Sequence, residues 1–320
     1  MQMKTMKINN VAPFVFLFLV LIVSCRNNAG TRAYDETPTR GNIRIGVDEA
    51  YQLLADSEIT IFESLYKYAK ISPVFSSEDS ILNLFLTDSI RIMITSRKLT
   101  ENEEAYLKEK LIIPRTTQIA WDGLAFIINH SNPDSLLRYN TVRDMFTGKV
   151  LSWKQINPKS RLGNIEIVFD NQGSSNVRLV MQKFKLGGKL PPYCYSANTN
   201  AQVIDYVEAH PEAIGIISVN WVSDPDDSIT HAFLKRVKVA GITSEFDSEG
   251  DDFYTPHPAY IADKSYPFIR EVYAISRETF AGLGRGFIQF VANDQGQRIV
   301  LKMGMVPATM PVRLVQIKKN

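Results

Sequence analysis

From residue 42 onward, segments with the residue pattern of strands alternate with segments whose apolar residues have helical spacing. Ile43, Ile45 and Val47 alternate with Arg44 and Gly46, which predicts a strand. Residues 58–69 then carry apolar side chains at close to helical spacing. A chain in which strands and helices alternate folds into α/β layers around a mostly parallel sheet, so we expect an α/β protein.

The same alternation continues to the end of the chain. We expect further strands at residues 74–75, 90–95, 119–129, 165–169, 213–219 and 267–275. We expect further helices at residues 80–87, 101–110, 141–146, 176–186, 201–210 and 286–303. Gly187-Gly188 should end the helix at 176–186, and loops are expected at 224–227 and 246–258.

The first residues have the features of an export signal. Lys4 and Lys7 precede thirteen almost wholly apolar residues, 11–23. This run is shorter than the roughly 20 residues of a membrane-spanning helix, and it fits the apolar part of a signal peptide. We therefore predict that residues 1–24 are a signal peptide.

The segment Ile22-Val23-Ser24-Cys25 resembles the bacterial lipobox, in which the Cys is lipidated and becomes the new N-terminus. Several acyl chains at about 0.8 kcal/mol per buried CH₂ suffice for stable anchoring. We predict lipidation at Cys25, a flexible polar tether over 25–41, and location at the envelope on the periplasmic side. The alternatives are a plain signal peptide or a short anchor helix.

Charge and cysteine content exclude several classes of protein. The formal net charge is +2, and the two excess positive charges are Lys4 and Lys7 in the predicted signal. No basic field is left to bind a nucleic acid. Only Cys194 remains beside Cys25, so an internal disulfide framework is not expected and the apolar core must stabilise the fold.

A glycine- and serine-rich turn follows the predicted strand at 165–169 and opens the next helix. It contains Gly173, Ser174, Ser175 and Asn176. The first N–H groups of a helix have no partner within it and point outward with partial positive charge, so such a turn can bind an anion. The alternative is that Ser174 is an ordinary helix cap.

Two other turns at strand ends are rich in hydroxyl groups. Ser76 and Ser77 lie between a strand and a helix, and Thr95, Ser96 and Arg97 follow the strand at 90–95. Open α/β sheets bind ligands at the carboxyl ends of their strands. Together the three turns predict a polar or anionic small ligand.

No catalytic or metal-binding arrangement is predicted, and no cofactor. Ser64-x-x-Lys67 matches one hydrolase motif, but Ser64 lies on an ordinary amphipathic helix and no Lys-Thr-Gly follows Asn220. The four histidines, His130, His210, His231 and His257, lack the spacing of metal ligands.

Five segments, in this order along the chain, resemble motifs of the substrate-binding proteins of bacterial phosphate ABC importers, a group of type II periplasmic binding proteins. They are residues 119–133 (IAWDGLAFIINHSNP), 146–153 (FTGKVLSW), 211–216 (PEAIGI), 266–270 (YPFIR), and 296–297 with 302–307 (GQ and KMGMVP). The resemblance implies a two-lobed α/β fold with two hinge-crossing strands. It places lobe one at 42–120 plus 262–320 and lobe two at 121–261.

The resemblance also implies a function and a site. A monomeric binding protein would hold phosphate or a related anion between its lobes and deliver it to an ABC permease in the inner membrane. Together with the three turns, the resemblance leads us to expect ligand-binding roles for Asp48, Glu49, Ser76, Ser77, Thr95, Ser96, Arg97, Gly173, Ser174, Ser175, Asn176 and Arg178.

The chain departs from the family pattern at several of these positions. Asp170 stands where the family has an arginine, and Gln172 where it has an aspartate. Arg97 and Arg178 could replace the missing arginine, and an acid could accept a phosphate proton. Alternatively, Asp48 and Glu49 simply begin a helix. The alternative function is an envelope lipoprotein that binds another solute or acts as a sensor or interaction protein.

Overall fold

The computed structural model describes residues 36–223 and 228–309. The predicted signal peptide, Cys25, most of the predicted tether, the turn at 224–227 and residues 310–320 lie outside the described residues. No helix in the described part combines the length and apolar character that a membrane span requires.

The first half of the described chain forms β1 (Arg40–Asp48), the 3₁₀ helix η1 (Glu49–Tyr51), α2 (Gln52–Leu65), β2 (Tyr68–Ser76), α3 (Glu78–Leu86), β3 (Ile92–Thr95), α4 (Glu101–Glu109), β4 (Arg115–Asn129), β5 (Leu136–Leu137), α5 (Tyr139–Phe146), α6 (Trp153–Ile156) and β6 (Glu166–Phe169).

The second half forms α7 (Ser175–Phe184), β7 (Cys194–Ser196), α8 (Asn200–Ala209), β8 (Ala213–Ser218), η2 (Val219–Trp221), α9 (Ser228–Leu234), β9 (Val237–Val239), β10 (Gly241–Thr243), β11 (Phe253–Tyr254), α10 (Pro258–Ala262), β12 (Ile269–Ser276), α11 (Leu283–Val291), α12 (Asp294–Lys302) and β13 (Val306–Pro307).

The main sheet of the described residues has the strand order β2-β1-β3-β12-β4-β8-β6-β7, and β9 and β13 also pair with β4. Strand β1 is parallel to β2 and β3, and β6 is parallel to β7 and β8. Strands β4 and β12 are antiparallel to each other. A smaller sheet has the order β11-β10-β5.

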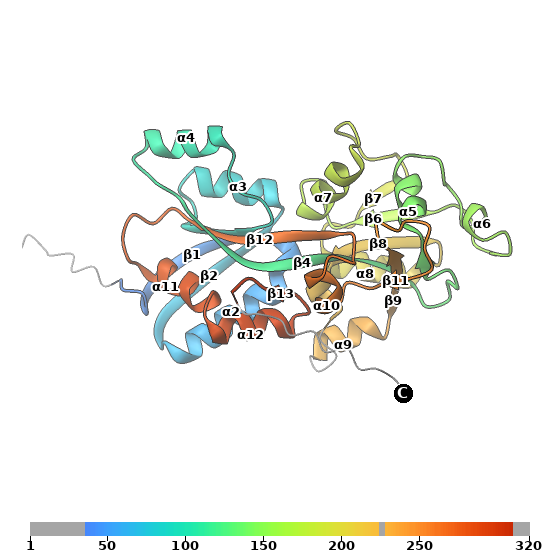
Figure 1. The fold of residues 1–320 in the computed structure, drawn as a ribbon. Helices are drawn as coiled ribbons and strands as arrows, with labels where there is room; N and C mark the ends of the chain where they lie inside the picture. The colour runs from blue at the N-terminus through green and yellow to red at the C-terminus, as the bar shows by residue number, and fades with distance from the viewer. Residues whose placement is uncertain (1–35, 224–227, 310–320) are drawn as a thin grey trace, which may run out of the picture. The chain divides into compact units, whose positions relative to one another are not determined.

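The long strand β4 joins two halves of this sheet. Its first part pairs with β12 and β13, and its second part pairs with β8 and β9. We call the part built on β1, β2 and β3 lobe one, and the part built on β6, β7 and β8 lobe two. Figure 1 shows β4 and β12 running side by side between the lobes. The predicted α/β fold with two lobes and two crossing strands is confirmed. The residue boundaries given for the lobes stay a prediction.

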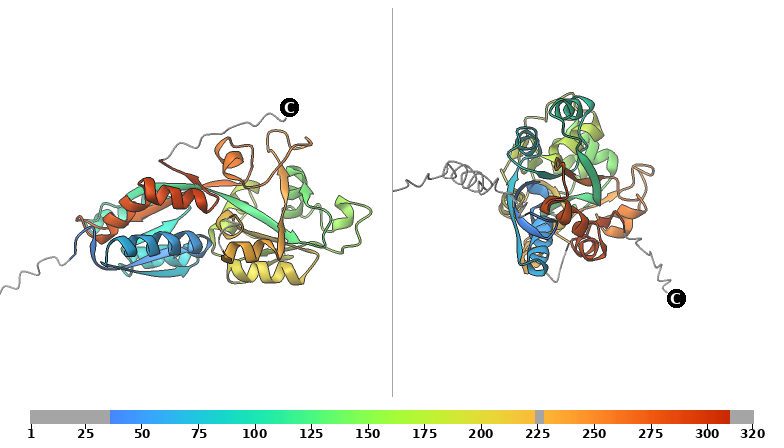
Figure 2. Two further views of the ribbon diagram at one scale, coloured as in Figure 1. Left: turned by 90° about the horizontal axis from the view of Figure 1, so that it is seen from below. Right: turned by 90° about the vertical axis from the view of Figure 1, so that its left-hand side faces the viewer.

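Helices cover both faces of the sheet in lobe one, which explains why its strands are apolar on both sides. Ile92 and Ile94 of β3 face one core cluster, which includes side chains of α2, α11 and α12. Met93 faces the other, with Ile81 of α3 and Leu107 of α4. Figures 1 and 2 show α2, α11 and α12 gathered against lobe one.

Lobe two follows the same rule. Ile167 of β6 faces the cluster that contains Val177 of α7, whereas Val168 faces the cluster that contains Val203 of α8. Helices α7 and α8 therefore pack on opposite faces of the same short strand. This packing places the first turn of α7 beside the crossing strands.

Several expected elements differ from the structure in their bounds. The helix predicted at 58–69 begins earlier and ends at Leu65, because residues 68–76 pair along the whole of β1 as strand β2. Pro73 is tolerated in β2 because this strand forms an edge of the sheet.

The single helix predicted at 286–303 is also wrong, because the chain forms two helices there. Asn293 separates α11 from α12, and its side chain accepts hydrogen bonds from the N–H groups of Gln295 and Gly296. A cap of this kind starts a new helix and turns the chain. Helix α7 likewise ends before the predicted Gly187, with Lys185 in the left-handed conformation at φ 53°.

Candidate ligand-binding cleft

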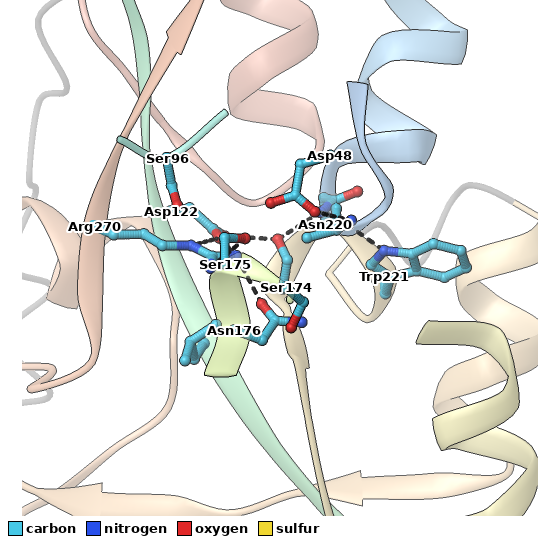
Figure 3. Close-up of polar contacts among 12 residues, drawn as sticks. Asp48, Ser96, Asp122, Ser174, Ser175, Asn176, Asn220, Trp221 and Arg270 are labelled. Atoms are coloured by element: carbon cyan, nitrogen blue, oxygen red, sulfur yellow. Dashed lines mark hydrogen bonds and ion pairs between the residues drawn. The ribbon is translucent and has the colours of Figure 1, made fainter. Parts of the chain in front are cut away.

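Arg270 is the centre of the polar contacts between the lobes. It lies on β12, is 6% exposed, and its Nε donates to Oδ2 of Asp122 at 2.8 Å. Its Nη1 donates to Ser175 Oγ and its Nη2 to Asn176 Oδ1, both at 2.9 Å (Figure 3). The guanidinium group also lies 5.1 Å from the ring centre of Tyr51. One buried cation thus joins a crossing strand to the first turn of α7.

Asp122 is the buried acceptor that orients Arg270. Its Oδ1 accepts from Ser218 Oγ at 2.8 Å, and Ser218 Oγ in turn accepts from Asn220 Nδ2 at 2.5 Å. Burial raises the pKa of Asp122, and the charge of Arg270 opposes that shift. Asn220 Nδ2 and Trp221 Nε1 also donate to the carbonyl oxygen of Ala50 in lobe one.

The structure buries both acids that follow β1. Asp48 is the N-cap of η1, where its Oδ1 accepts from the N–H of Ala50 at 3.2 Å. Its Oδ2 has no partner in the described part of the chain. Glu49 accepts from the N–H of Asn200 at 3.0 Å, so a lobe-one acid caps helix α8 of lobe two. The predicted start of a helix at these acids is present, and they also face the other lobe.

Asp170 is a third buried acid at the same place. It follows β6, its Oδ2 lies 3.5 Å from Asn200 Nδ2, and its Oδ1 has no partner among the described residues. Burial, above all, raises the pKa of Asp48 to about 8, of Glu49 to about 7 and of Asp170 to about 6. The charge of Asp170 contributes to the shifts of the other two. The raised pKa of Asp48 favours its protonated form at neutral pH.

The hydroxyl groups at the end of β3 contact Glu78 of α3. Thr95 Oγ1 donates to Glu78 Oε1 at 2.5 Å, and the N–H of Ser96 does so at 3.1 Å. Arg178 of α7 donates to both carboxylate oxygens of Glu78 and, from Nη2, to Ser96 Oγ at 2.7 Å. Thr95, Ser96 and Arg178 therefore lie together, and an internal carboxylate lies among them.

The remaining predicted residues have local roles in this structure. Ser77 caps α3 by accepting from the N–H of Ser80, and Ser76 is the last residue of β2. Arg97 pairs with Glu103, which belongs to the capping box of α4. Ser174 caps α7 by accepting from the N–H of Val177 at 3.3 Å. Gly173 accepts through its carbonyl from the N–H of Asp79 at 3.3 Å, which brings the two lobes together.

A cavity of about 380 Å³ opens beside these contacts. Its lining includes Glu78, Asp79, Gly173, Ser174 and Arg178. A second cavity of about 420 Å³ lies next to it in lobe two and shares Gln172, Val177, Met181 and Gly188 with the first. Asp48 and Arg270 line neither of these two cavities, because side chains of both lobes already surround them.

Three residues that form this cleft have no role that the sequence predicts. Arg270 is the last residue of the YPFIR segment, which is a signal for the position and not for a ligand role. Glu78 directly follows the turn that contains Ser76 and Ser77. Tyr51 has a buried hydroxyl that lacks a partner in the described part of the chain, and no pattern marked it.

Comparisons with known proteins agree with this architecture. The family model described as "PBP superfamily domain" matches residues 32–295. The phosphate-binding protein PstS of Staphylococcus saprophyticus is 25% identical over 221 residues, which cover 67% of this chain and 64% of that protein. The protein of the same name from Bacillus subtilis is 23% identical over 193 residues, which cover 60% of this chain and 57% of that protein. The chain thus spans less than two thirds of the length of these two relatives.

Solved structures show the same fold. A structure from Clostridium perfringens, described as a phosphate ABC transporter substrate-binding protein with bound phosphate, has a TM-score of 0.69 and 21% identity. The match covers 84% of this chain and 100% of that one. An ABC-type phosphate transport receptor from Vibrio cholerae has a TM-score of 0.60 at 19% identity, with 83% and 100% covered. Because the family model matches most of the chain, the chain belongs to the periplasmic binding protein (PBP) superfamily.

Proposed function

We propose that this protein is the substrate-binding lipoprotein of an ABC importer and that it binds inorganic phosphate between its lobes. The observation that carries the proposal is the arrangement of Arg270 against the first turn of α7. Arg270 Nη2 also lies 2.8 Å from Asp122 Oδ2, so Asp122, Ser175 and Asn176 engage four of the five guanidinium N–H groups and leave one, on Nη1, for a ligand. The N–H groups of Ser175 and Asn176 belong to the first turn of α7 and have no partner within the helix.

The buried acids suit a protonated anion. Phosphate at neutral pH carries at least one P–O–H group, whereas sulfate carries none. Asp170 Oδ1 is a buried oxygen without a partner among the described residues, and a P–O–H group can donate to it. We therefore expect phosphate to be preferred over sulfate. Because both lobes enclose this site, binding requires hinge opening and closure.

The test is isothermal titration of the chain from Arg26 onward with phosphate, with sulfate and citrate as controls. Several charge-assisted hydrogen bonds at about 1.5–3 kcal/mol each account for the roughly 8 kcal/mol of a micromolar affinity. Ser175→Ala should weaken phosphate binding about tenfold, because Ser175 Oγ holds Arg270 in place. Ser152→Ala, which alters the capping box of α6 away from the cleft, is the matched control.

A folded protein that binds no phosphate would overturn the phosphate assignment and leave the fold intact. The second candidate function, binding of another solute or a sensor role, is favoured by one observation. Five acids, Asp48, Glu49, Glu78, Asp122 and Asp170, lie around two arginines, Arg178 and Arg270. Such a cleft suits a ligand rich in hydrogen-bond donors, and a screen of amines and polyols would detect one.

A further inference from the structure

Glu78 has an unusual position for the first residue of a helix. An acid at this position normally lies in solvent, where it interacts with the helix dipole. In this protein the Glu78 side chain is buried, with only 3% of the residue exposed, and it turns toward the end of β3. Glu101, the equivalent first residue of α4, is exposed to solvent. The helix position alone therefore does not explain the burial of Glu78.

The carboxylate of Glu78 is surrounded by donors in the way a bound anion would be. Oε1 accepts from Thr95 Oγ1 at 2.5 Å, from the Ser96 N–H at 3.1 Å and from Arg178 Nη2 at 3.2 Å. Ser96 Oγ lies 3.3 Å from the same oxygen, and Oε2 accepts from Arg178 Nε at 2.5 Å. Thr95, Ser96 and Arg178 are residues that we expect, from the sequence, to bind an anionic ligand.

The contacts of Glu78 also cross the cleft. Thr95 and Ser96 belong to lobe one, whereas Arg178 belongs to α7 of lobe two. The next residue, Asp79, donates from its N–H to the Gly173 carbonyl oxygen of lobe two at 3.3 Å. The beginning of α3 therefore binds lobe two at two neighbouring points.

Glu78 is ionised in this position. Burial alone would raise its pKa, but hydrogen bonds and charge from Arg178 outweigh burial, and the pKa lies below its ordinary value. An ionised carboxylate has oxygens that can take the place of two oxygens of phosphate. The cavity of about 380 Å³ that Glu78 and Arg178 line provides space for an anion next to it.

We propose that the Glu78 carboxylate competes with the anionic ligand for the same donors. Without ligand, Glu78 binds Thr95, Ser96 and Arg178 and thereby holds the lobes together. An incoming anion takes over Arg178 and the Ser96 hydroxyl as Glu78 withdraws. The competition rests on the proposed function, whereas the effect on lobe closure does not. Glu78 thereby lowers the affinity of the protein for anions and sets the anion concentration at which it responds.

The test combines two measurements on Glu78→Ala, with Glu101→Ala as the matched control at the same helix position. Small-angle X-ray scattering of the ligand-free proteins reports lobe separation. We expect a larger radius of gyration for Glu78→Ala than for the wild type and Glu101→Ala. Isothermal titration should show an affinity for inorganic phosphate at least tenfold higher in Glu78→Ala than in the wild type, because Thr95, Ser96 and Arg178 no longer bind a carboxylate. Glu78→Gln keeps the shape of the side chain and loses its charge. Its radius of gyration and its phosphate affinity should lie between those of the wild type and Glu78→Ala.

Each result decides a separate part of the proposal. Phosphate affinity that is unchanged or lower in both Glu78 variants would overturn the competition. An unchanged radius of gyration in both variants would overturn the role in lobe closure. If no variant binds phosphate at all, the proposed function fails, and the scattering data alone then support or overturn the closure. If Glu78→Ala does not fold, Glu78→Gln provides both measurements, and Arg178→Gln, which also removes a donor for the anion, provides the scattering comparison alone.

Discussion

At the scale of single residues, burial decides the chemistry of this cleft more than residue type does. Asp48, Glu49 and Asp170 are ordinary acids in the sequence, yet their pKa values rise to about 8, 7 and 6 because the lobes remove water from them. Glu78 lies in the same cleft and shifts the other way, because Arg178 contacts it directly. The cleft therefore holds neutral and ionised acids side by side at neutral pH.

These shifts predict how stability depends on pH. A carboxyl with a raised pKa binds more protons in the folded than in the unfolded state, so its contribution favours folding less as pH rises. For Asp48 this loss runs from its unfolded value near 3.8 to about 8. We expect the thermal midpoint of the ligand-free protein to fall between pH 5 and pH 8. Asp48→Asn should reduce the slope, as measured by thermal unfolding in a pH series.

Asp294→Asn is the control for this series, because Asp294 is an exposed acid in the first turn of α12. The thermal midpoint of Asp294→Asn should change with pH as steeply as that of the wild type. A slope for Asp48→Asn as steep as the wild-type slope would contradict the idea that Asp48 is protonated in the folded state.

At the scale of elements, close packing decides where helices and strands end. The chain over 286–303 has helical spacing throughout, but Asn293 caps a second helix, and Gly296 lies against the backbone of the first. A Cβ on Gly296 would lie 2.5 Å from the carbonyl oxygen of Phe290. The same kind of contact explains Gly286 in α11, where a Cβ would lie 1.7 Å from the carbonyl oxygen of Pro38.

Gly286→Ala should therefore destabilise the protein, although glycine-to-alanine changes inside a helix usually stabilise it by about 1 kcal/mol. Because the backbone must move to admit the methyl group, we expect a loss of about 1–3 kcal/mol in the free energy of unfolding. Urea unfolding measures the effect. Gly163→Ala, where the nearest atom would be 4.0 Å away, is the control and should change little. An unchanged or higher midpoint for Gly286→Ala would show that α11 does not pack against residue 38 in this way.

At the scale of the whole molecule, the body folds around two crossing strands, and the sequence before it predicts how that body is held at a membrane. If residues 1–24 are removed and Cys25 is lipidated, acyl chains anchor the protein and the polar tether allows the lobes to move. Such an anchor would keep a binding protein near its permease. This arrangement is a prediction from the sequence.

Cys25→Ser should abolish incorporation of radiolabelled palmitate and shift processed protein from the membrane to the soluble fraction. The label must be followed together with fractionation, because an uncleaved signal peptide would also hold the protein at the membrane. Cys194→Ser, which leaves the lipobox intact, is the control and should keep both the label and the membrane location. Labelled Cys25→Ser protein would contradict the assignment of the anchor.

The sequence by itself determined the α/β class, most elements and the family, because these depend on side-chain spacing within about a dozen residues and on motifs in order. It also indicated the turns at residues 76–77, 95–97 and 173–176. Only the tertiary structure decided how the cleft is assembled. Asp122 and Arg270 are 148 residues apart, and Glu78 and Arg178 are 100 apart. Such partners are chosen by the packing of the lobes and the removal of water, which local spacing does not encode.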